Sequence, residues 1–277
     1  MTTRPLKFSI VVPSFNQGRF IEETILSVLE QDYPEKELIV IDGGSTDNTL
    51  DVIRKYEGRI TYWVSERDRG QAHAVNKGLA VATGDIFGWQ NSDDIYLPGA
   101  FQSAAETWVG SPEVDLVYGS LKFIDPEGVE IDEMRLIPAN RFNMLYDGSL
   151  IKNQSAFWRR NLVNRLGGID ETLSFCMDYE FFLRAVRSGA RIRLIPRPLG
   201  AFRRHSGSKT GTIPSVWREE LLSVQARHGA NASVMTRTAA KMLCLAYRGA
   251  CYARQGDWGY LASRIVRRAT GRAGGPL

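Results

Sequence analysis

Two adjacent carboxylates, Asp93 and Asp94, stand where an apolar stretch of the sequence ends. They close the segment IFGWQNSDD, which begins with the pattern of a buried strand. Because like charges repel, two acids beside a buried edge cost free energy unless an arginine, water or a metal ion lies between them. Asp42 closes a second apolar stretch, ELIVID, in the same way. Acids placed like this suit Mg²⁺ or Mn²⁺, since both ions prefer hard oxygen ligands.

The stretches that carry these acids belong to an alternating pattern of strands and helices. Short apolar runs predict strands at residues 7–12, 37–42, 60–66 and 85–90. Apolar residues at helical spacing predict helices between them, the last of which ends at Gly84. This order is typical of an α/β domain with a largely parallel sheet. Such sheets bind ligands outside the carboxyl ends of their strands, so the three acids should face one crevice.

The second half of the chain has a looser pattern and one further acid of interest. Strands are predicted in DLVYG and NQSAFWRR, a hairpin around residues 125–128, and two short strands in RIRLIP and LGAFRR. Asp178 begins a strong helix pattern that Gly189 ends. A helix N-terminus favours the carboxylate form of Asp178, whereas burial among its aromatic neighbours would raise its pKa. Helices follow, so we expect a domain at 1–212 and a helical extension at 213–277.

Several common sites are excluded because their motifs are missing from the sequence. No GxGxxG follows the first strand, and no GxxxxGK[ST], HExxH or GxSxG segment occurs. Three histidines are too few for a His-rich zinc site. The cysteines Cys176, Cys244 and Cys251 form no CxxC pair, so neither a disulfide framework nor a thiolate metal site is expected. This cysteine usage fits a reducing, cytoplasmic location.

Positive charge is concentrated towards the C-terminus. The net charge is +4, and residues 215–277 hold ten Lys/Arg against three acids. The plainer interpretation is a solvated helical face. The alternative is peripheral contact with the inner face of an anionic membrane. Nucleic-acid binding is not expected, because the basic residues are not part of a recognised module.

Several separated motifs, taken in order, resemble the inverting glycosyltransferases of family 2, which have the GT-A fold. The motifs are VVPSFN, VIDGGSTDNT, GQAHAVNKGLAVATGD, NSDD, MDYEFFLR and RRHSGSKT, and the resemblance covers roughly residues 6–210. It implies a mixed, mostly parallel α/β sheet flanked by helices, with the basic helices as a C-terminal extension. It also implies a nucleoside diphosphate sugar as donor and a divalent cation, Mn²⁺ or Mg²⁺, as cofactor.

The resemblance assigns the donor nucleotide to the first two motifs. Asp42 would recognise the base, with Pro13, Ser14 and Asn16 beside it. The plain alternative for Asp42 is that it forms the turn before Gly43.

The resemblance assigns the diphosphate to the NSDD and RRHSGSKT segments. Asp93 would bind the metal, and Asp94 would support the metal or the sugar. His205 would reach the metal or the diphosphate, and Lys209 would pair with phosphate. Asn91 stands where many relatives have Asp. An asparagine keeps an oxygen ligand but lacks the negative charge, so metal binding should be weaker.

The resemblance assigns the chemistry to Asp178, as the base that takes a proton from the acceptor hydroxyl in a single inverting displacement. Gln154 and Trp158 would line the acceptor side. The acceptor would be a saccharide or a lipid-linked molecule, used in bacterial surface polysaccharide or glycolipid assembly. Two other functions stay open at this stage. One is a nucleotidyltransferase, for which PSFNQGRF makes a poor phosphate loop, and the other is a sugar-nucleotide-binding protein without turnover, which only Asn91 supports.

Overall fold

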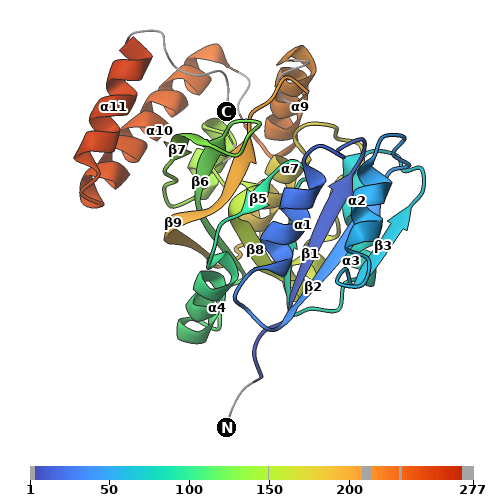
Figure 1. Ribbon diagram of the computed structural model, residues 1–277. Coiled ribbons are helices and arrows are strands. Elements are labelled where there is room, and N and C mark those ends of the chain that lie inside the picture. The colour runs from blue at the N-terminus through green and yellow to red at the C-terminus, as the bar shows by residue number, and fades with distance from the viewer. Residues whose placement is uncertain (1–3, 149, 208–213, 231–232, 270–277) are drawn as a thin grey trace.

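A mixed sheet forms the body of the protein in the computed structural model, which describes residues 4–148, 150–207, 214–230 and 233–269 (Figure 1). In spatial order its strands are β3 (Tyr62–Ser65), β2 (Lys36–Asp42), β1 (Phe8–Ser14), β4 (Ile86–Trp89), β8 (Ala156–Arg159), β6 (Leu116–Ile124), β9 (Ile192–Arg203) and β5 (Ile95–Tyr96). A further strand, β7 (Glu130–Met134), pairs with β6. Strands β5, β7 and β8 run antiparallel to their neighbours and the others run parallel, which confirms the predicted sheet.

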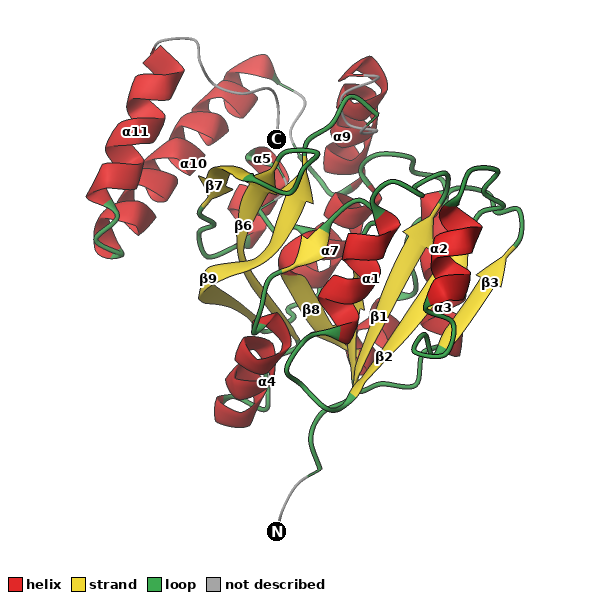
Figure 2. Cartoon of the chain, viewed as in Figure 1, coloured by secondary structure: helices red, strands yellow, loops and turns green. Residues whose placement is uncertain are grey.

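Helices cover both faces of this sheet (Figure 2). One face is packed by α1 (Ile21–Leu29), α2 (Thr49–Lys55) and α4 (Ala100–Gly110). The other is packed by α3 (Gln71–Val81), α6 (Arg160–Leu166), α7 (Met177–Arg187), α9 (Pro214–Arg227) and α10 (Val234–Arg254). Strand β1 shows why two layers are needed. Its Ile10 and Val12 enter one core and Val11 the other, because successive side chains of a strand point to opposite faces.

Two predictions about element boundaries were wrong. Helix α3 ends at Val81, three residues before Gly84. A Cβ at Gly84 would lie 2.6 Å from the Lys7 carbonyl oxygen, so this glycine permits the close approach of the chain to β1. RIRLIP and LGAFRR form one continuous strand, β9, whose register against β6 shifts near Pro198. The hairpin at 125–128 and the stop at Gly189, whose φ is 79°, are confirmed.

The remaining helices frame the C-terminal half of the sheet. These are α5 (Arg141–Tyr146), the 3₁₀ turn η1 (Asn153–Ser155) and α11 (Trp258–Ala269). Val224 of α9 and Cys251 and Tyr252 of α10 are buried in the same core as the sheet. Across the described ranges, no helix has both the length and the apolar composition that spanning a membrane requires.

Candidate active site

One large pocket, of about 720 Å³, opens at the carboxyl ends of the parallel strands. Its N-terminal wall, as we define it, comes from residues 13–93, and includes Pro13, Ser14, Gly43, Gln71, Asn91 and Asp93. Its C-terminal wall comes from residues 121–221, and includes Lys152, Gln154, Phe175, Asp178, Trp217 and Leu221. The two walls therefore join segments that are far apart in the sequence.

Asp42 lies behind the N-terminal wall rather than on it. Strand pairing puts Ser14, Asp42 and Ser65 in one row. The Asp42 carboxylate is fully buried and accepts hydrogen bonds from the Gly44 and Ser45 amides, at 3.1 and 2.9 Å, and from the Ser45 and Ser65 hydroxyls. Four donors saturate a carboxylate. Asp42 therefore holds the loop of Gly43 and Ser45 in place, and its contact with the base stays a prediction.

Ser14 offers the N-terminal wall an unsatisfied polar group. Ser14 is 4% exposed and lines the pocket beside Pro13, and its hydroxyl has no hydrogen-bond partner in the structure. A buried hydroxyl without a partner is costly, so a ligand that bonds to it gains free energy. Asn16 is exposed and turned aside, since its side-chain oxygen accepts the Thr46 amide at 2.8 Å.

Asp93 and His205 face each other at the pocket. Their side chains are 19% and 9% exposed, and His205 Nε2 lies 3.0 Å from an Asp93 carboxylate oxygen. Within the described part of the chain, His, Cys, Asp and Glu side chains form no cluster of three or more that could hold a metal. One carboxylate and one imidazole nevertheless fit Mg²⁺ or Mn²⁺, because these ions take few protein ligands and fill their shell with water and phosphate oxygens.

Asp94 is buried away from the pocket and is held by three donors. Its carboxylate accepts the Arg203 amide at 2.8 Å and the side-chain amides of Gln154 and Asn91, both at 2.9 Å. Burial, and next the charge of Asp93, raise the pKa of Asp94 well above its usual value. Asp94 thus holds Gln154, Asn91 and the Arg203 backbone together, and its support of the metal or sugar stays a prediction. The Asn91 side-chain oxygen accepts from Gln71 at 2.8 Å, so Asn91 joins Gln71 to Asp94.

The buried guanidinium of Arg203 fixes the position of Asp93. Its Nε donates to the Asp93 carbonyl oxygen at 3.0 Å, and another nitrogen lies 2.6 Å from Glu23 on α1. A third donates to the Asp125 and Pro126 carbonyl oxygens in the hairpin turn. The guanidinium thus holds the Asp93 backbone, and the Arg203 amide holds the Asp94 carboxylate, which leaves the Asp93 carboxylate facing the pocket.

Asp178 and Lys152 both line the C-terminal wall, near enough for the charge of each to affect the pKa of the other. Asp178 lies in the first turn of α7, and its carboxylate accepts its neighbour's amide, Tyr179 N–H, at 2.7 Å. Burial raises the pKa of Asp178, and the Lys152 charge opposes that shift. Burial likewise lowers the pKa of Lys152, whereas Asp178 raises it. A carboxylate with a raised pKa in a pocket has the character of a general base.

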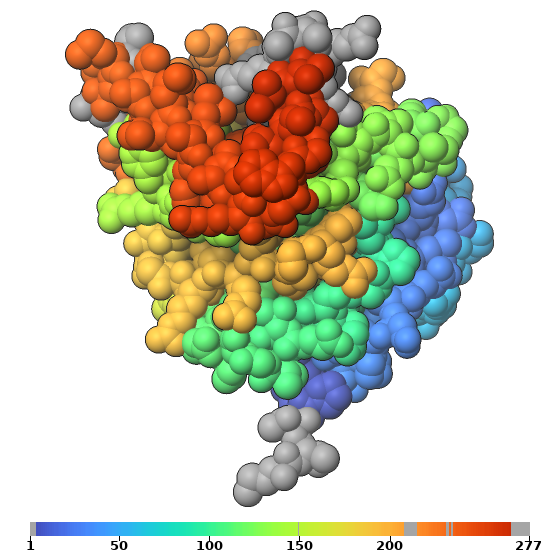
Figure 3. Space-filling model, turned by 90° about the vertical axis from the view of Figure 1, so that its left-hand side faces the viewer, coloured from blue at the N-terminus to red at the C-terminus, as the bar shows by residue number. Residues whose placement is uncertain are grey.

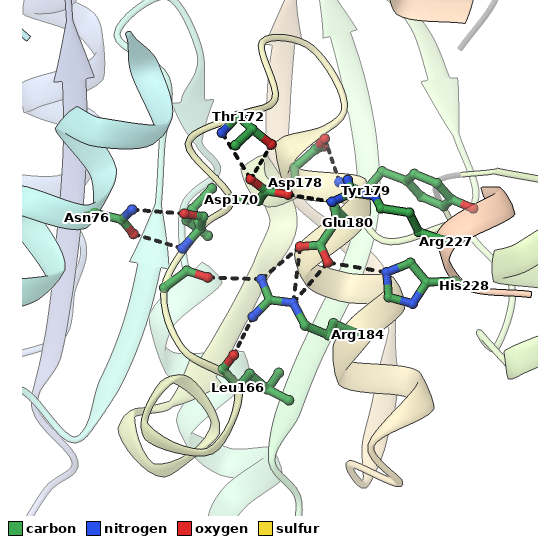
Figure 4. A network of polar contacts seen from close by, with 12 residues as sticks. Asn76, Leu166, Asp170, Thr172, Asp178, Tyr179, Glu180, Arg184, Arg227 and His228 are labelled. Carbon is green, nitrogen blue, oxygen red and sulfur yellow. Dashed lines mark hydrogen bonds and ion pairs between the residues drawn. The ribbon is translucent and has the colours of Figure 1, made fainter. Parts of the chain in front are cut away.

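The loop before Asp178 is fixed by a network of polar contacts (Figure 4). Asn76 of α3 exchanges two hydrogen bonds with the Ile169 backbone, at 2.8 and 2.9 Å. Arg184 pairs with Glu180 at 2.8 Å and donates to the Gly168 carbonyl oxygen at 2.9 Å. His228, which follows α9, lies 3.3 Å from Glu180. Arg227 of α9 pairs with Asp170 at 2.9 Å, so the segment before Asp178 is attached to α3, α7 and α9.

Glu220 of α9 caps this segment directly. Its carboxylate accepts the amides of Ser174, Phe175 and Cys176, at 2.8, 2.8 and 3.0 Å, just ahead of α7. A carboxylate at a helix N-terminus satisfies amides that lack helical partners and interacts well with the helix dipole. The helix α9 also contributes Trp217 and Leu221 to the pocket wall. The C-terminal extension thus takes part in building the site.

The remaining predicted residues, Gln154, Trp158 and Lys209, differ in where they lie. Gln154 lines the pocket, as expected for an acceptor-side residue. Trp158 is absent from the pocket lining and is fully buried in the core against Phe181 and Phe182. Lys209 lies outside the described residues.

Sequence reasoning missed Lys152, Glu220, Trp217 and Arg203. No local motif marks the first three, since their roles come from contacts between distant segments. Arg203 stands inside the quoted segment RRHSGSKT, so its place in the motif was a usable signal.

A model of glycosyl transferase family 2 matches residues 9–169 of the chain. An uncharacterised glycosyltransferase of Mycobacterium tuberculosis is 34% identical over 188 residues, which cover 67% of this chain and 70% of the relative. Another from Rickettsia conorii is 30% identical over 205 residues, covering 68% of this chain and 34% of the relative.

Two solved structures have a similar fold. TarS of S. aureus, solved with UDP-GlcNAc, has a TM-score of 0.66 and 22% identity, covering 85% of this chain and 70% of TarS. The mannosyltransferase PcManGT of Pyrobaculum calidifontis, solved with GDP-Man and Mn²⁺, has a TM-score of 0.60 and 22% identity, covering 99% of this chain and 77% of the other. At this identity the likeness concerns the fold, and it confirms a GT-A-like architecture.

Proposed function

The chain belongs to glycosyl transferase family 2, and we propose that it transfers a sugar from a nucleoside diphosphate donor to an acceptor hydroxyl with inversion at the anomeric carbon. The observation that carries this proposal is one pocket lined on one side by Asp93, which His205 contacts, and on the other by Asp178 and Lys152. The two solved relatives named above bind UDP-GlcNAc and GDP-Man, which supports the donor class.

The donor lies along the N-terminal wall in this proposal. The loop of Gly43 and Ser45, which Asp42 holds rigid, and the free hydroxyl of Ser14 receive the nucleotide. Asp93 and His205 would hold Mn²⁺ or Mg²⁺ against the diphosphate, where a divalent cation neutralises the charge of the leaving group. PcManGT, which was solved with GDP-Man and Mn²⁺, supports this choice of ions.

Asp178 acts as the general base in this proposal. It takes the proton from the acceptor hydroxyl as that oxygen attacks the anomeric carbon opposite the leaving group, which gives inversion in one step. General-base catalysis of this kind contributes about 10²–10⁴-fold. Covalent catalysis by the pocket cysteine is disfavoured, because burial raises the pKa of Cys176 to about 12 and keeps it a thiol.

The acceptor lies against the C-terminal wall, where Phe175, Trp217 and Leu221 offer apolar surface next to Asp178. Such surface suits the apolar face of a saccharide or the lipid of a lipid-linked acceptor. We place the reaction in the assembly of a bacterial surface polysaccharide or glycolipid, as the family resemblance implies.

The test is thermal unfolding with UDP, GDP and dTDP and their sugars, each with and without Mn²⁺. A ligand at 100 times its Kd should stabilise the protein by about 2.7 kcal/mol. A metal-dependent rise for one nucleotide class is the expected result. Donor binding without any release of nucleoside diphosphate to any acceptor would favour the alternative, a binding protein that has lost turnover.

A further inference from the structure

The hairpin formed by α10 and α11 presents large apolar side chains to solvent. Six of them are between 60% and 83% exposed: Met235, Met242, Leu243, Trp258, Ile265 and Val266. Single exposed apolar residues are ordinary on a protein surface, whereas a group of them on neighbouring elements marks an interaction site.

Helical spacing places these side chains on one side of each helix. On α10 the exposed apolar side chains follow the i, i+4, i+7, i+8, i+11, i+15 pattern. They are Met, Leu and Ala at residues 235, 239, 242, 243, 246 and 250. On α11, residues 258, 262, 265 and 266 are exposed Trp, Ala, Ile and Val. We call these two series the apolar stripes. The opposite side of α10 is buried through Cys244, Cys251 and Tyr252.

Both stripes point away from the body of the protein. The inner sides of the two helices meet the segment after β7, where the Tyr252 hydroxyl donates to the Arg135 carbonyl oxygen at 2.8 Å and the Tyr260 hydroxyl accepts the Arg135 amide at 3.1 Å. The rings of Tyr252 and Tyr260 lie 5.1 Å apart and join the helices. Figure 3 shows α11 on the outer surface of this face.

The two helices of the hairpin carry charge of one sign, and Asp257 in the turn between them pairs with Arg135. Residues 234–254 and 258–269 contain seven Lys/Arg and no Asp or Glu. The exposed Lys241 and Arg254 flank the α10 stripe. By contrast, α9 carries Glu219 and Glu220. Arg248 and Arg264 pair with acids of the body, Asp147 and Asp132, whereas Lys241 and Arg254 are exposed. Apolar stripes on helices without acidic residues match a partner that is anionic at its surface and apolar beneath, as an anionic bilayer is.

We propose that the α10–α11 hairpin docks on an anionic lipid bilayer. A second copy of this chain fits less well, because a symmetric contact would place two basic surfaces against each other. A nucleic acid would use the charge but leave Met242, Leu243 and Ile265 in water. The hairpin adjoins the pocket, since Arg248 of α10 pairs with Asp147 on the pocket wall. Docking therefore brings the pocket to the membrane, and it does not depend on the proposed function.

The test is co-sedimentation of the full chain with vesicles of phosphatidylcholine alone or mixed with phosphatidylglycerol, at low and high salt. We expect binding to the anionic vesicles only, weakened by salt. The double variant Lys241→Glu/Arg254→Glu should bind at least about tenfold more weakly, since each Lys/Arg near an anionic surface contributes about fivefold. Met242→Ser/Ile265→Ser should also lose binding, by removing the inserted side chains.

Matched controls separate these effects from a general loss of charge or apolar surface. Val109→Ser removes an 83% exposed valine on α4, and Arg193→Glu reverses an exposed arginine on β9, and both should bind as the wild type does. All variants change exposed positions, and their thermal unfolding and turnover of a water-soluble acceptor should be unchanged.

Three results would overturn the proposal. One is that anionic vesicles are not bound by the wild type, or are bound equally well by the wild type and by Met242→Ser/Ile265→Ser. Another is a dimer that Met242→Ser/Ile265→Ser dissolves, without vesicle binding. The third is tight binding to duplex DNA or RNA in place of lipid. Loss of vesicle binding with turnover intact leaves the proposed function standing, and loss of turnover with vesicle binding intact leaves the docking surface standing.

Discussion

The two walls of the pocket are built in different ways. The N-terminal wall comes from consecutive parallel strands, whose register alone puts Ser14, Asp42 and Ser65 in a row. The C-terminal wall needs α7, η1 and α9, which lie tens of residues apart and meet through side chains such as Glu220 and Arg184. The first wall is therefore encoded locally and the second by long-range contacts.

The comparison shows that a carboxylate in a sequence motif does not always line the pocket. Of the three motif acids on the N-terminal side, Asp42 and Asp94 are fully buried and hold loops in place, and Asp93 alone lines the pocket. On the C-terminal wall, Asp178 faces the pocket with a cation near it, in a position that the helix dipole alone would also favour. Single substitutions on each wall test this difference.

Asp93→Ala tests the N-terminal wall. It should abolish the Mn²⁺-dependent part of donor stabilisation, up to about 2.7 kcal/mol at 100 times Kd, because the protein loses its only pocket-facing acid beside His205 among the described residues. Thermal unfolding with donor and metal measures this effect. Asp32→Ala, at an exposed acid, is the control. A metal-dependent shift that survives in Asp93→Ala would remove Asp93 from the metal site.

Glu220→Ala tests whether the extension supports the C-terminal wall. Three backbone amides would lose their acceptor, so the free energy of unfolding should fall by about 1–3 kcal/mol. Turnover should fall as well, since these amides adjoin Asp178. Glu219→Ala changes an exposed neighbour on the same helix and should do neither. Equal stability of the two variants in denaturant unfolding would show that α9 is not needed for the wall.

Lys152→Met tests, through the pH profile of kcat, how the Lys152 charge affects the pKa of Asp178. A base must be ionised, so activity falls as pH drops through the pKa of Asp178, which burial holds above its usual value. The Lys152 charge lowers that pKa, so its removal should move the acid limb to higher pH. Lys152→Arg should keep the limb in place. An unchanged limb in Lys152→Met would mean that the two charges are not coupled.

Trp217→Ala tests the apolar part of the C-terminal wall and should have the smallest effect. Loss of one contact surface is expected to raise the acceptor KM about tenfold, with donor affinity unchanged. Trp158→Ala is the informative comparison, because removal of this core side chain should cost about 3–5 kcal/mol of stability instead. A rise in the donor Kd of Trp217→Ala would contradict this assignment, because the indole would then contact the donor.

The sequence predicts the N-terminal half of the fold better than the site. Buried apolar runs define β1, β2 and β4, because a strand covered on both faces must be largely apolar. Gly84 was misread as a helix stop, since its role is a close approach to the Lys7 carbonyl that no local pattern reveals. Trp158 was placed at the acceptor and lies in the core, because β8 turns that face of the strand towards α7. Lys152 and Glu220 act across long sequence separations and leave no periodic signal.

The most direct measurement compares donor affinity with turnover in Asp178→Asn. The account predicts that the donor Kd, measured by calorimetry with Mn²⁺ present, stays at the wild-type value while kcat falls by about 10²–10⁴-fold. Asp51→Asn, which changes another acid in the first turn of a helix, should leave both unchanged. Wild-type turnover in Asp178→Asn would contradict the account, because Asp178 would then be an ordinary helix-terminal acid.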